Sequence, residues 1–361
     1  MSAQVTVEII EGLNEWRSLS RAWDESLSLS SSDEIFLSWN WLSTWAEEFL
    51  DKKRSLFVLI VRKDGELIGA APWSVRTVAQ AGGRIKQIES LGQPEAGSDY
   101  LDMIAVRGAE KTVASALYDF LFKKGMHLWD TAMLRDIPAD SPVLLHFLSR
   151  LREDGKYVEI TEGSYCPKLD LPLTEAAFVA GLSPNRRQQW RRHIRELEKK
   201  GEIQHIQYRG HDARTAFDYF FNIYEKNYRD NKLKKYLERY AETEKGAQTI
   251  QIDMLHWREQ AVAGLFHLIH KDTQYMYLMA VDKEANPKIS IGNILLGFVM
   301  QEAISQKRRV YDFLKGTEDY KFHWADRGSR ALNLFFCRKK ISSLVPVIER
   351  SVKNIAKVLV R

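Results

Sequence analysis

A weak internal repeat is the feature that most constrains the fold of this chain. Each half contains strand hairpins in which apolar and polar residues alternate at a period of two, which is typical of a sheet with one covered face. A helical segment follows the hairpins in each half, and after it comes a strand that begins with an aromatic residue and Asp. The hairpins span residues 56–77 and 249–282, the helices span 112–125 and 293–309, and the Asp residues are Asp130 and Asp312. This order predicts duplication of one α/β module, and a chance likeness of two generic α/β units is the alternative.

The length of the chain fits two such modules. A chain of 361 residues corresponds to about two domains of ordinary size. We expect one module over residues 1–165 and a second over 166–361, with a basic helix at 183–200 near their junction. Gly69-Ala70 and Ala263-Gly264 stand at the start of the second strand of the two hairpin sets and add to the match.

The composition is that of a soluble globular protein, with 45% hydrophobic and 28% charged residues. No apolar run reaches the roughly 18 residues that span a bilayer, and the acidic start of the chain differs from a secretory signal peptide. Cys166 and Cys337 cannot build a disulfide framework, and no Cys or His pair has the spacing of a zinc finger. We therefore expect a cytoplasmic protein without a transmembrane segment and without a metal cofactor.

The net charge of +5 is concentrated in residues 183–200, which hold seven Lys and Arg residues against two Glu residues. Ser183 is a typical N-cap, and Pro184 suits the first helical position. On this predicted helix Arg187 and Arg191 lie one turn apart, beside an apolar seam. The seam consists of Trp190, Ile194 and Leu197. Because Arg binds oxyanions in a bidentate manner, we predict that Arg187 and Arg191 bind the phosphate or carboxylate of a substrate. The alternative is the solvated face of an interdomain helix.

Residues 290–293, Ser-Ile-Gly-Asn, open the second of the repeated helices. Small residues at a helix start leave backbone N–H groups open to a pyrophosphate, and the helix dipole favours its negative charge. Ser290, Gly292 and Asn293 are therefore candidate cofactor-binding residues, with an ordinary helix cap as the alternative.

A polar turn after the strand that ends at Gly316 carries several groups that can act on a proton or a charge. They are Glu318, Asp319, Tyr320, Lys321, His323 and Trp324. Lys321 can bind a phosphate or a developing negative charge, and Asp319 can accept a proton from an attacking amine or hydroxyl. A polar surface turn is the alternative.

In the first half, Asp99 and Asp102 flank Tyr100 where the chain enters a strand. The three side chains could orient a polar acceptor. An Asp at a strand entry also caps turns, and that is the alternative.

Five segments in this order resemble the tandem-GNAT acyltransferases of the FemXAB-like superfamily. The most similar group is the bacterial "cellulose biosynthesis" (CelD/BcsL-type) acetyltransferases found with exopolysaccharide genes. The segments are IFLSWNWLSTWAEEF, GSDYLDMIA, RRQQWRRHIRELEKKG, SIGNILL and YDFLKGTEDYKFHW. The resemblance covers nearly the whole chain and implies an α/β (α+β) fold of two tandem GNAT-like modules. Each module would be a mixed, mostly antiparallel sheet flanked by helices.

The resemblance also implies roles for individual residues. SIGNILL matches the place where GNAT proteins hold the pyrophosphate of acyl-CoA, although the fuller Arg/Gln-x-x-Gly-x-Gly/Ala loop is missing. Tyr320 and Lys321 match a late Tyr-Lys pair that contacts the substrate or transition state, and Arg187 and Arg191 match the basic helix between the modules. The second module is then the one expected to be active.

The function implied by the resemblance is acyl transfer by direct attack, because the sequence carries no nucleophile–base motif such as G-x-S-x-G. Acetyl-CoA or another acyl-CoA is the expected co-substrate, and the acceptor is a sugar nucleotide, a polysaccharide precursor or a small amine. Asp319 and Asp99 are the candidate bases. Two alternatives stay open: a transferase that uses aminoacyl-tRNA, and a non-catalytic GNAT-fold protein that binds an anionic partner.

Overall fold

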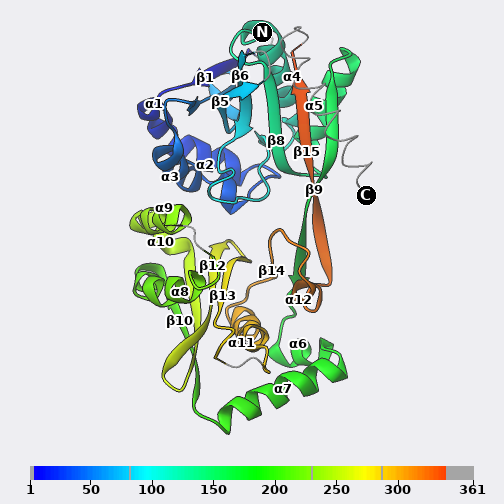
Figure 1. Cartoon of the computed structure of the whole chain (residues 1–361). Coiled ribbons are helices and arrows are strands. Elements are labelled where there is room, and N and C mark those ends of the chain that lie inside the picture. The colour runs from blue at the N-terminus through cyan, green and yellow to red at the C-terminus, as the bar shows by residue number, and fades with distance from the viewer. Residues whose placement is uncertain (1–3, 81–82, 229–230, 286–287, 339–361) are drawn as a thin grey trace. The chain divides into compact units, whose positions relative to one another are not determined.

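The computed structural model describes residues 4–80, 83–228, 231–285 and 288–338 (Figure 1). The chain forms two compact units, of which unit 1 comprises the residues up to Ser164 together with 330–338, and unit 2 comprises Tyr165–Ser329. The chain leaves unit 1 within β9 (Val158–Asp170) and returns to it within β15 (Arg327–Cys337). Residues 339–361, which the sequence assigns to the second module, lie outside the described residues.

Unit 1 contains a four-stranded antiparallel sheet in the order β1-β3-β4-β7. A second group of strands runs in the order β8-β6-β5-β2, in which β6 is parallel to β8 and the other neighbours are antiparallel. The strands are β1 (Val5–Ile10), β2 (Arg54–Leu56), β3 (Val58–Lys63), β4 (Glu66–Ala71), β5 (Trp73–Gln80), β6 (Gly83–Ser90), β7 (Ile104–Ala105) and β8 (Thr131–Pro138). The helices are α1 (Leu13–Ser18), α2 (Ser20–Ser28), η1 (Ile35–Leu37), α3 (Trp39–Phe49), α4 (Glu110–Asp119), η2 (Phe120–Lys124) and α5 (Pro142–Glu153).

Unit 2 contains an antiparallel run of strands in the order β10-β11-β12-β13, followed by β14 parallel to β13. The strands are β10 (Ile203–Arg209), β11 (Ile250–Trp257), β12 (Gln260–His270), β13 (Thr273–Val281) and β14 (Val310–Asp312). The helices are α6 (Glu175–Gly181), α7 (Pro184–Glu198), η3 (Gly210–Ala216), α8 (Phe217–Tyr224), α9 (Asn231–Glu242), α10 (Glu244–Thr249), α11 (Ile291–Ser305) and α12 (Asp319–Phe322). No helix of the described part is long and apolar enough to cross a membrane.

Helices cover both faces of the unit 2 strands (Figure 1). On one face Ala263 belongs to an apolar core with the buried side of α11. The neighbouring Gly264 points to the other face, where a Cβ atom would lie 2.7 Å from the ring of Phe220 in α8. Residues of β12 therefore alternate between two apolar layers instead of between an apolar layer and water.

The order of hairpins, helix and strand that the repeat predicts is present in both units, as β3, β4, α4 and β8 in unit 1 and as β11, β12, β13, α11 and β14 in unit 2. The small residues that the sequence matches between the two halves also occupy corresponding positions in the strands. Gly69 pairs with Ala105 of β7, and Ala263 pairs with Val281 of β13. A Cβ atom at Gly69 would lie 2.5 Å from Val113 of α4, so this position faces the helix as Ala263 faces α11. The segment 56–77 was expected to hold two strands. It holds β3 and β4 and also the first residues of a third strand, β5, which begins at Trp73.

Candidate functional site

The first turn of α11 is the centre of the candidate site in unit 2. The helix begins at Ile291, directly after Ser290, and no side chain caps its start. The backbone N–H of Ile291 donates to the carbonyl of Ile289 at 2.9 Å, and those of Asn293 and Ile294 both donate to the carbonyl of Ser290, at 3.1 and 3.2 Å. Of the first four N–H groups, that of Gly292 has no partner among the described residues, and the dipole of the 15-residue helix gives this end a partial positive charge.

A hollow of about 410 Å³ lies beside this turn, and we call it the β13 hollow. It is lined by Met279 and Val281 of β13, by residues 282–283, by residues 289–293 and by Tyr320. β14 pairs with β13 only from Thr273 to Tyr275, so the later residues of β13 border the hollow beyond the paired stretch. A Cβ atom at Gly292 would approach Val281 to 3.1 Å, so the absence of a side chain there keeps the hollow open.

A polar clamp fixes the end of β13 at this hollow. Lys226 Nζ lies 2.7 Å from Asp282 Oδ2, and the amide of Asn227 donates to the carbonyl of Val281 at 3.2 Å. The hydrogen bond from Lys226 holds the pKa of Asp282 below its usual value, so the carboxylate is ionised at neutral pH.

Tyr320 is the residue of α12 that reaches the β13 hollow. Burial, and then the neighbouring Glu318, raise the pKa of Tyr320 above its ordinary value. The phenol is therefore protonated at neutral pH and can donate a hydrogen bond or a proton.

Lys321 and Asp319 lie next to Tyr320 in the chain but outside the described lining of the hollow. Lys321 is buried, and its ammonium donates to the carbonyl of Lys315 at 2.6 Å and pairs with Glu318 at 3.1 Å. Asp319 is exposed at the first position of α12. These contacts hold the turn that carries Tyr320, and a catalytic role of Lys321 stays a prediction.

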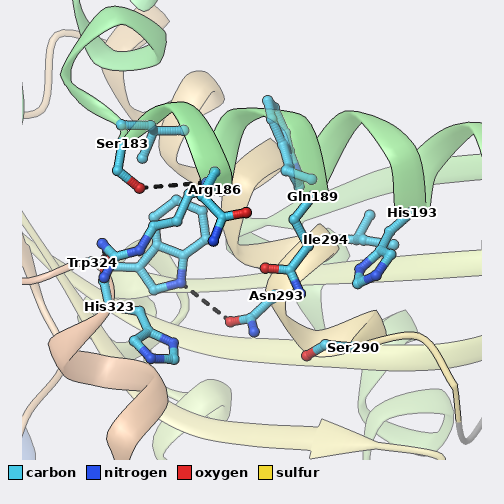
Figure 2. Close-up of a pocket in the computed structure, with 12 residues that line it drawn as sticks. Ser183, Arg186, Gln189, His193, Ser290, Asn293, Ile294, His323 and Trp324 are labelled. Atoms are coloured by element: carbon cyan, nitrogen blue, oxygen red, sulfur yellow. Dashed lines mark hydrogen bonds between the residues drawn. The ribbon is translucent and has the colours of Figure 1, made fainter.

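A second hollow of about 350 Å³ lies on the other side of the same turn, and we call it the α7 hollow (Figure 2). Its walls come from α7, from the start of α11 and from the two residues that follow α12, His323 and Trp324. Among the described residues, only Ser290 and Asn293 line both hollows. Ser183 and Pro184 begin α7 as predicted, with Ser183 Oγ accepting from the Arg186 N–H at 3.4 Å.

Two indole rings form the apolar part of the α7 hollow together with Leu182 and Ile294. Trp324 stacks on Phe178, with ring centroids 6.1 Å apart and an interplanar angle of 11°, and its Nε1–H donates to Asn293 Oδ1 at 3.2 Å (Figure 2). Trp190 packs on the backbone of Gly297, where a Cβ atom would lie 2.5 Å from the indole. Both rings are therefore held in fixed positions.

The sequence placed Arg187 and Arg191 in an anion site, and the structure places them on α7 outside the described lining of both hollows. The α7 arginine that lines a hollow is Arg186, and Gln189 and His193 line it too (Figure 2). Helical spacing identifies this face of α7 but does not tell which residues will meet His323 from a distant part of the chain.

Asp99, Tyr100 and Asp102 lie together in unit 1, and all three are buried. Asp102 accepts hydrogen bonds from Ser32 Oγ at 2.8 Å and from the Met103 N–H at 2.7 Å. Burial raises the pKa of Asp102 to about 6. These residues therefore take part in the packing of unit 1, and their role toward an acceptor stays a proposal.

Comparison with known proteins agrees with this geometry. Residues 184–322 match the family model described as "Acetyltransferase (GNAT) domain". The chain is similar in structure to the crystal structure of FemX. The alignment covers 92% of this chain and 96% of the FemX chain, with 12% sequence identity and a TM-score of 0.57. The chain has a tandem GNAT-like fold.

Two further solved structures have the same fold. The C-terminal domain of a putative lysylphosphatidylglycerol synthetase from Agrobacterium fabrum is 12% identical over 94% of this chain and 97% of its own, with a TM-score of 0.53. A conserved protein of unknown function from Bacteroides thetaiotaomicron is 10% identical over 92% of this chain and 100% of its own, with a TM-score of 0.53. No curated protein matches the chain by sequence.

Proposed function

We propose that the protein is an acyltransferase that binds an acyl-CoA donor in the β13 hollow. The observation that carries the proposal is the uncapped start of α11 at a hollow bordered by the later residues of β13. A pyrophosphate at the helix start gains from its N–H groups and dipole. An extended acyl arm can hydrogen-bond along a strand edge beyond the paired stretch. Ser290, Gly292 and Asn293 are the residues proposed to hold the donor.

The proposed reaction is direct attack of an amine or hydroxyl on the thioester carbonyl. A C–N or C–O bond forms, the carbonyl oxygen carries negative charge in the tetrahedral intermediate, and the C–S bond then breaks. We assign stabilisation of the oxyanion to backbone N–H groups of β13 beyond the stretch that pairs with β14. Tyr320, protonated at neutral pH, is proposed to donate a hydrogen bond to the leaving sulfur, and the thiolate takes its proton from solvent. Of the two candidate bases we propose Asp319, which is exposed on unit 2, over Asp99, which is buried in unit 1.

The proposed acceptor is a sugar nucleotide, a polysaccharide precursor or a small amine, as in the exopolysaccharide-associated acetyltransferases that the sequence resembles. A second candidate donor, aminoacyl-tRNA, is favoured by the exposed arginines of α7. Arg191, Arg192 and Arg195 are exposed there, and Arg187 is partly exposed. A row of guanidinium groups suits a phosphate backbone.

Binding of acetyl-CoA tests the donor site. We expect Gly292→Leu to weaken binding about 100-fold or more, because the new side chain would occupy the space in front of Val281. Calorimetric titration measures the affinity, and Gly181→Leu is the matched control, since a Cβ atom at Gly181 has nothing within 4 Å. Both variants should keep the circular-dichroism spectrum of the unchanged protein.

The same titrations separate the alternatives. Acetyl-CoA binding that survives Gly292→Leu unchanged would remove the β13 hollow as the donor site. Salt-sensitive binding of bulk tRNA without binding of CoA would favour the aminoacyl-tRNA donor. Binding of neither would favour the non-catalytic protein.

A further inference from the structure

The α7 hollow has a chemistry of its own that the acyl-donor site does not use. Its volume of about 350 Å³ lies within the range of small-ligand pockets. The two fixed indole rings of Trp190 and Trp324 offer flat apolar surface. None of the described residues that line it is Asp or Glu, whereas Arg186 and two histidines are among them.

The nitrogen atom of Trp190 is the most informative of these groups. Trp190 lines the hollow, and its Nε1 is buried with no hydrogen-bond partner among the described residues. Buried polar groups are almost always paired, so this N–H indicates a missing partner. His193, which is 8% exposed, points into the hollow beside it (Figure 2), and its ring nitrogens can bond a molecule bound there. Gln189 and His323, also in Figure 2, have polar side-chain atoms that the described residues leave available.

Arg186 supplies the charge. One of its terminal nitrogens, Nη1, donates to the carbonyl of His323, which fixes the guanidinium at the rim of the hollow. Nε and Nη2 have no partner among the described residues and can form the bidentate contact that an oxyanion accepts. The exposed arginines of α7 add a positive field that attracts an anion toward this face.

We propose that the α7 hollow is a second ligand site, which binds a nucleoside phosphate apart from the acyl donor. The planar base packs between the indole rings, and its polar edge meets His193 and Gln189. The phosphate binds Arg186 at the rim. If the proposed function holds, a nucleotide-activated acceptor supplies this chemistry, and its reactive end then lies next to the β13 hollow.

The two hollows are lined by largely different residues, and we therefore treat them as separate sites. Their described linings share only Ser290 and Asn293, and the Asn293 side chain is held in place by Trp324 Nε1. Gly292 belongs to the β13 hollow alone, and Arg186 belongs to the α7 hollow alone. A substitution at either residue therefore tests one site and spares the other.

Calorimetric titration of the full chain with uridine diphosphate tests the proposal. We expect saturable binding that is weaker by about tenfold or more for uridine and for inorganic phosphate, because each lacks one half of the ligand. Arg186→Gln should weaken uridine diphosphate binding about 10- to 100-fold through the lost charged hydrogen bonds. Arg192→Gln removes one charge from an exposed position of the same helix and should change the affinity less than about threefold.

A second variant tests the same hollow without changing Arg186, in case Arg186→Gln weakens binding only by disturbing the fold. Gln189→Trp should fill the hollow and remove measurable binding of uridine diphosphate, while acetyl-CoA affinity stays within about twofold. Conversely, Gly292→Leu should leave uridine diphosphate binding intact. Failure of acetyl-CoA to bind at all would count against the proposed function and leave the nucleotide site standing.

Three results would overturn the second site. Saturating acetyl-CoA should leave uridine diphosphate bound, so competition between the two would show that the hollows form one site. Phosphate that binds as tightly as uridine diphosphate would remove the role of the indole rings. Unchanged binding in both Arg186→Gln and Gln189→Trp would place the ligand elsewhere.

Discussion

Asp253→Ala is expected to lower the free energy of unfolding by about 3–5 kcal/mol, the range found when one partner of a buried charged network is removed. Asp253 lies on β11 and is fully buried. Its carboxylate accepts hydrogen bonds at 2.8 Å from His205, Gln207 and Gln251. His267 Nδ1 lies 3.1 Å from the second oxygen, and His267 Nε2 is bonded to the hydroxyl of Tyr311 at 2.8 Å.

The size of this effect follows from what alanine would leave behind. Three strands, β10, β12 and β14, send polar side chains to this one carboxylate, directly or through His267. Without it, His205, Gln207, Gln251 and His267 lose their acceptor in the interior, where an unsatisfied polar group costs about 1–3 kcal/mol. Burial by itself would raise the pKa of Asp253, but the hydrogen bonds and charge of His205 and His267 overcome it and lower the pKa. This stabilisation is present above the ordinary pKa of an Asp and is lost only as the pH falls through the lowered value.

Urea unfolding of the full chain at pH 7 measures the effect. Asp218→Ala is the matched control, because the Asp218 side chain is 88% exposed and lies 3.9 Å from Lys234, and its stability should change by less than about 0.5 kcal/mol. Asp253→Asn keeps the shape but not the charge and should fall between the two. A loss below about 1 kcal/mol in Asp253→Ala would mean that water replaces the carboxylate and that the network does not support the fold.

This network also shows what the sequence could not reveal. On β11 the polar Gln251 and Asp253 alternate with Ile250 and Ile252, a pattern that reads as a sheet with one face in water. The structure covers both faces, and Gln251 and Asp253 are 1% and 0% exposed. Alternation tells which side chains share a face, but whether a helix covers that face depends on segments distant in the chain.

Features that depend on neighbouring residues in the chain, such as helix starts and apolar helix faces, could be predicted from the sequence. The N-cap at Ser183 follows from side-chain chemistry within one turn of helix. Helix α11 begins after Ser290 as predicted, although no side chain caps its start. The buried seam of α7, with Leu197 at 0% exposure, follows from helical spacing. The α7 hollow differs, because Arg186 and His323 are 137 positions apart and meet only through the packing of α7 on unit 2.

The segment around Tyr100 shows a second kind of limit. Its run of Asp, Tyr and Asp resembles an exposed polar loop, and the structure buries all three residues. Tyr100 adopts a positive φ of 56°, a conformation that a pattern of residue types does not predict for tyrosine. The burial raises the pKa of Asp102, and this shift can be measured.

Asp102→Asn is expected to stabilise the protein at neutral pH relative to acidic pH, by about 2.4 kcal/mol between pH 4 and pH 7. Asp102 is 3% exposed, and burial raises its pKa from 3.8 to about 6 although Ser141, Ser32 and the Met103 N–H donate hydrogen bonds to it. Because the folded state holds the proton more tightly than the unfolded state, its stability falls as the pH rises from about 4 to about 6, and the full cost is present above pH 6. Below pH 4 the carboxyl group is neutral in the folded state, and most of this cost is absent.

Asparagine cannot ionise, so the variant removes the cost while its carbonyl can still accept from the Met103 N–H. Thermal or urea unfolding at pH 4, 5, 6 and 7 gives the stability difference between the variant and the unchanged protein, and this difference should rise with pH through the window from 4 to 6. Asp64→Asn is the control, because Asp64 is exposed in the β3–β4 turn and should change the stability by less than about 0.5 kcal/mol throughout. A stability difference for Asp102→Asn that is constant across the four pH values would contradict the raised pKa. Asp102 would then have the same pKa in the folded and unfolded states, with its hydrogen bonds from Ser32 and Met103 balancing its burial.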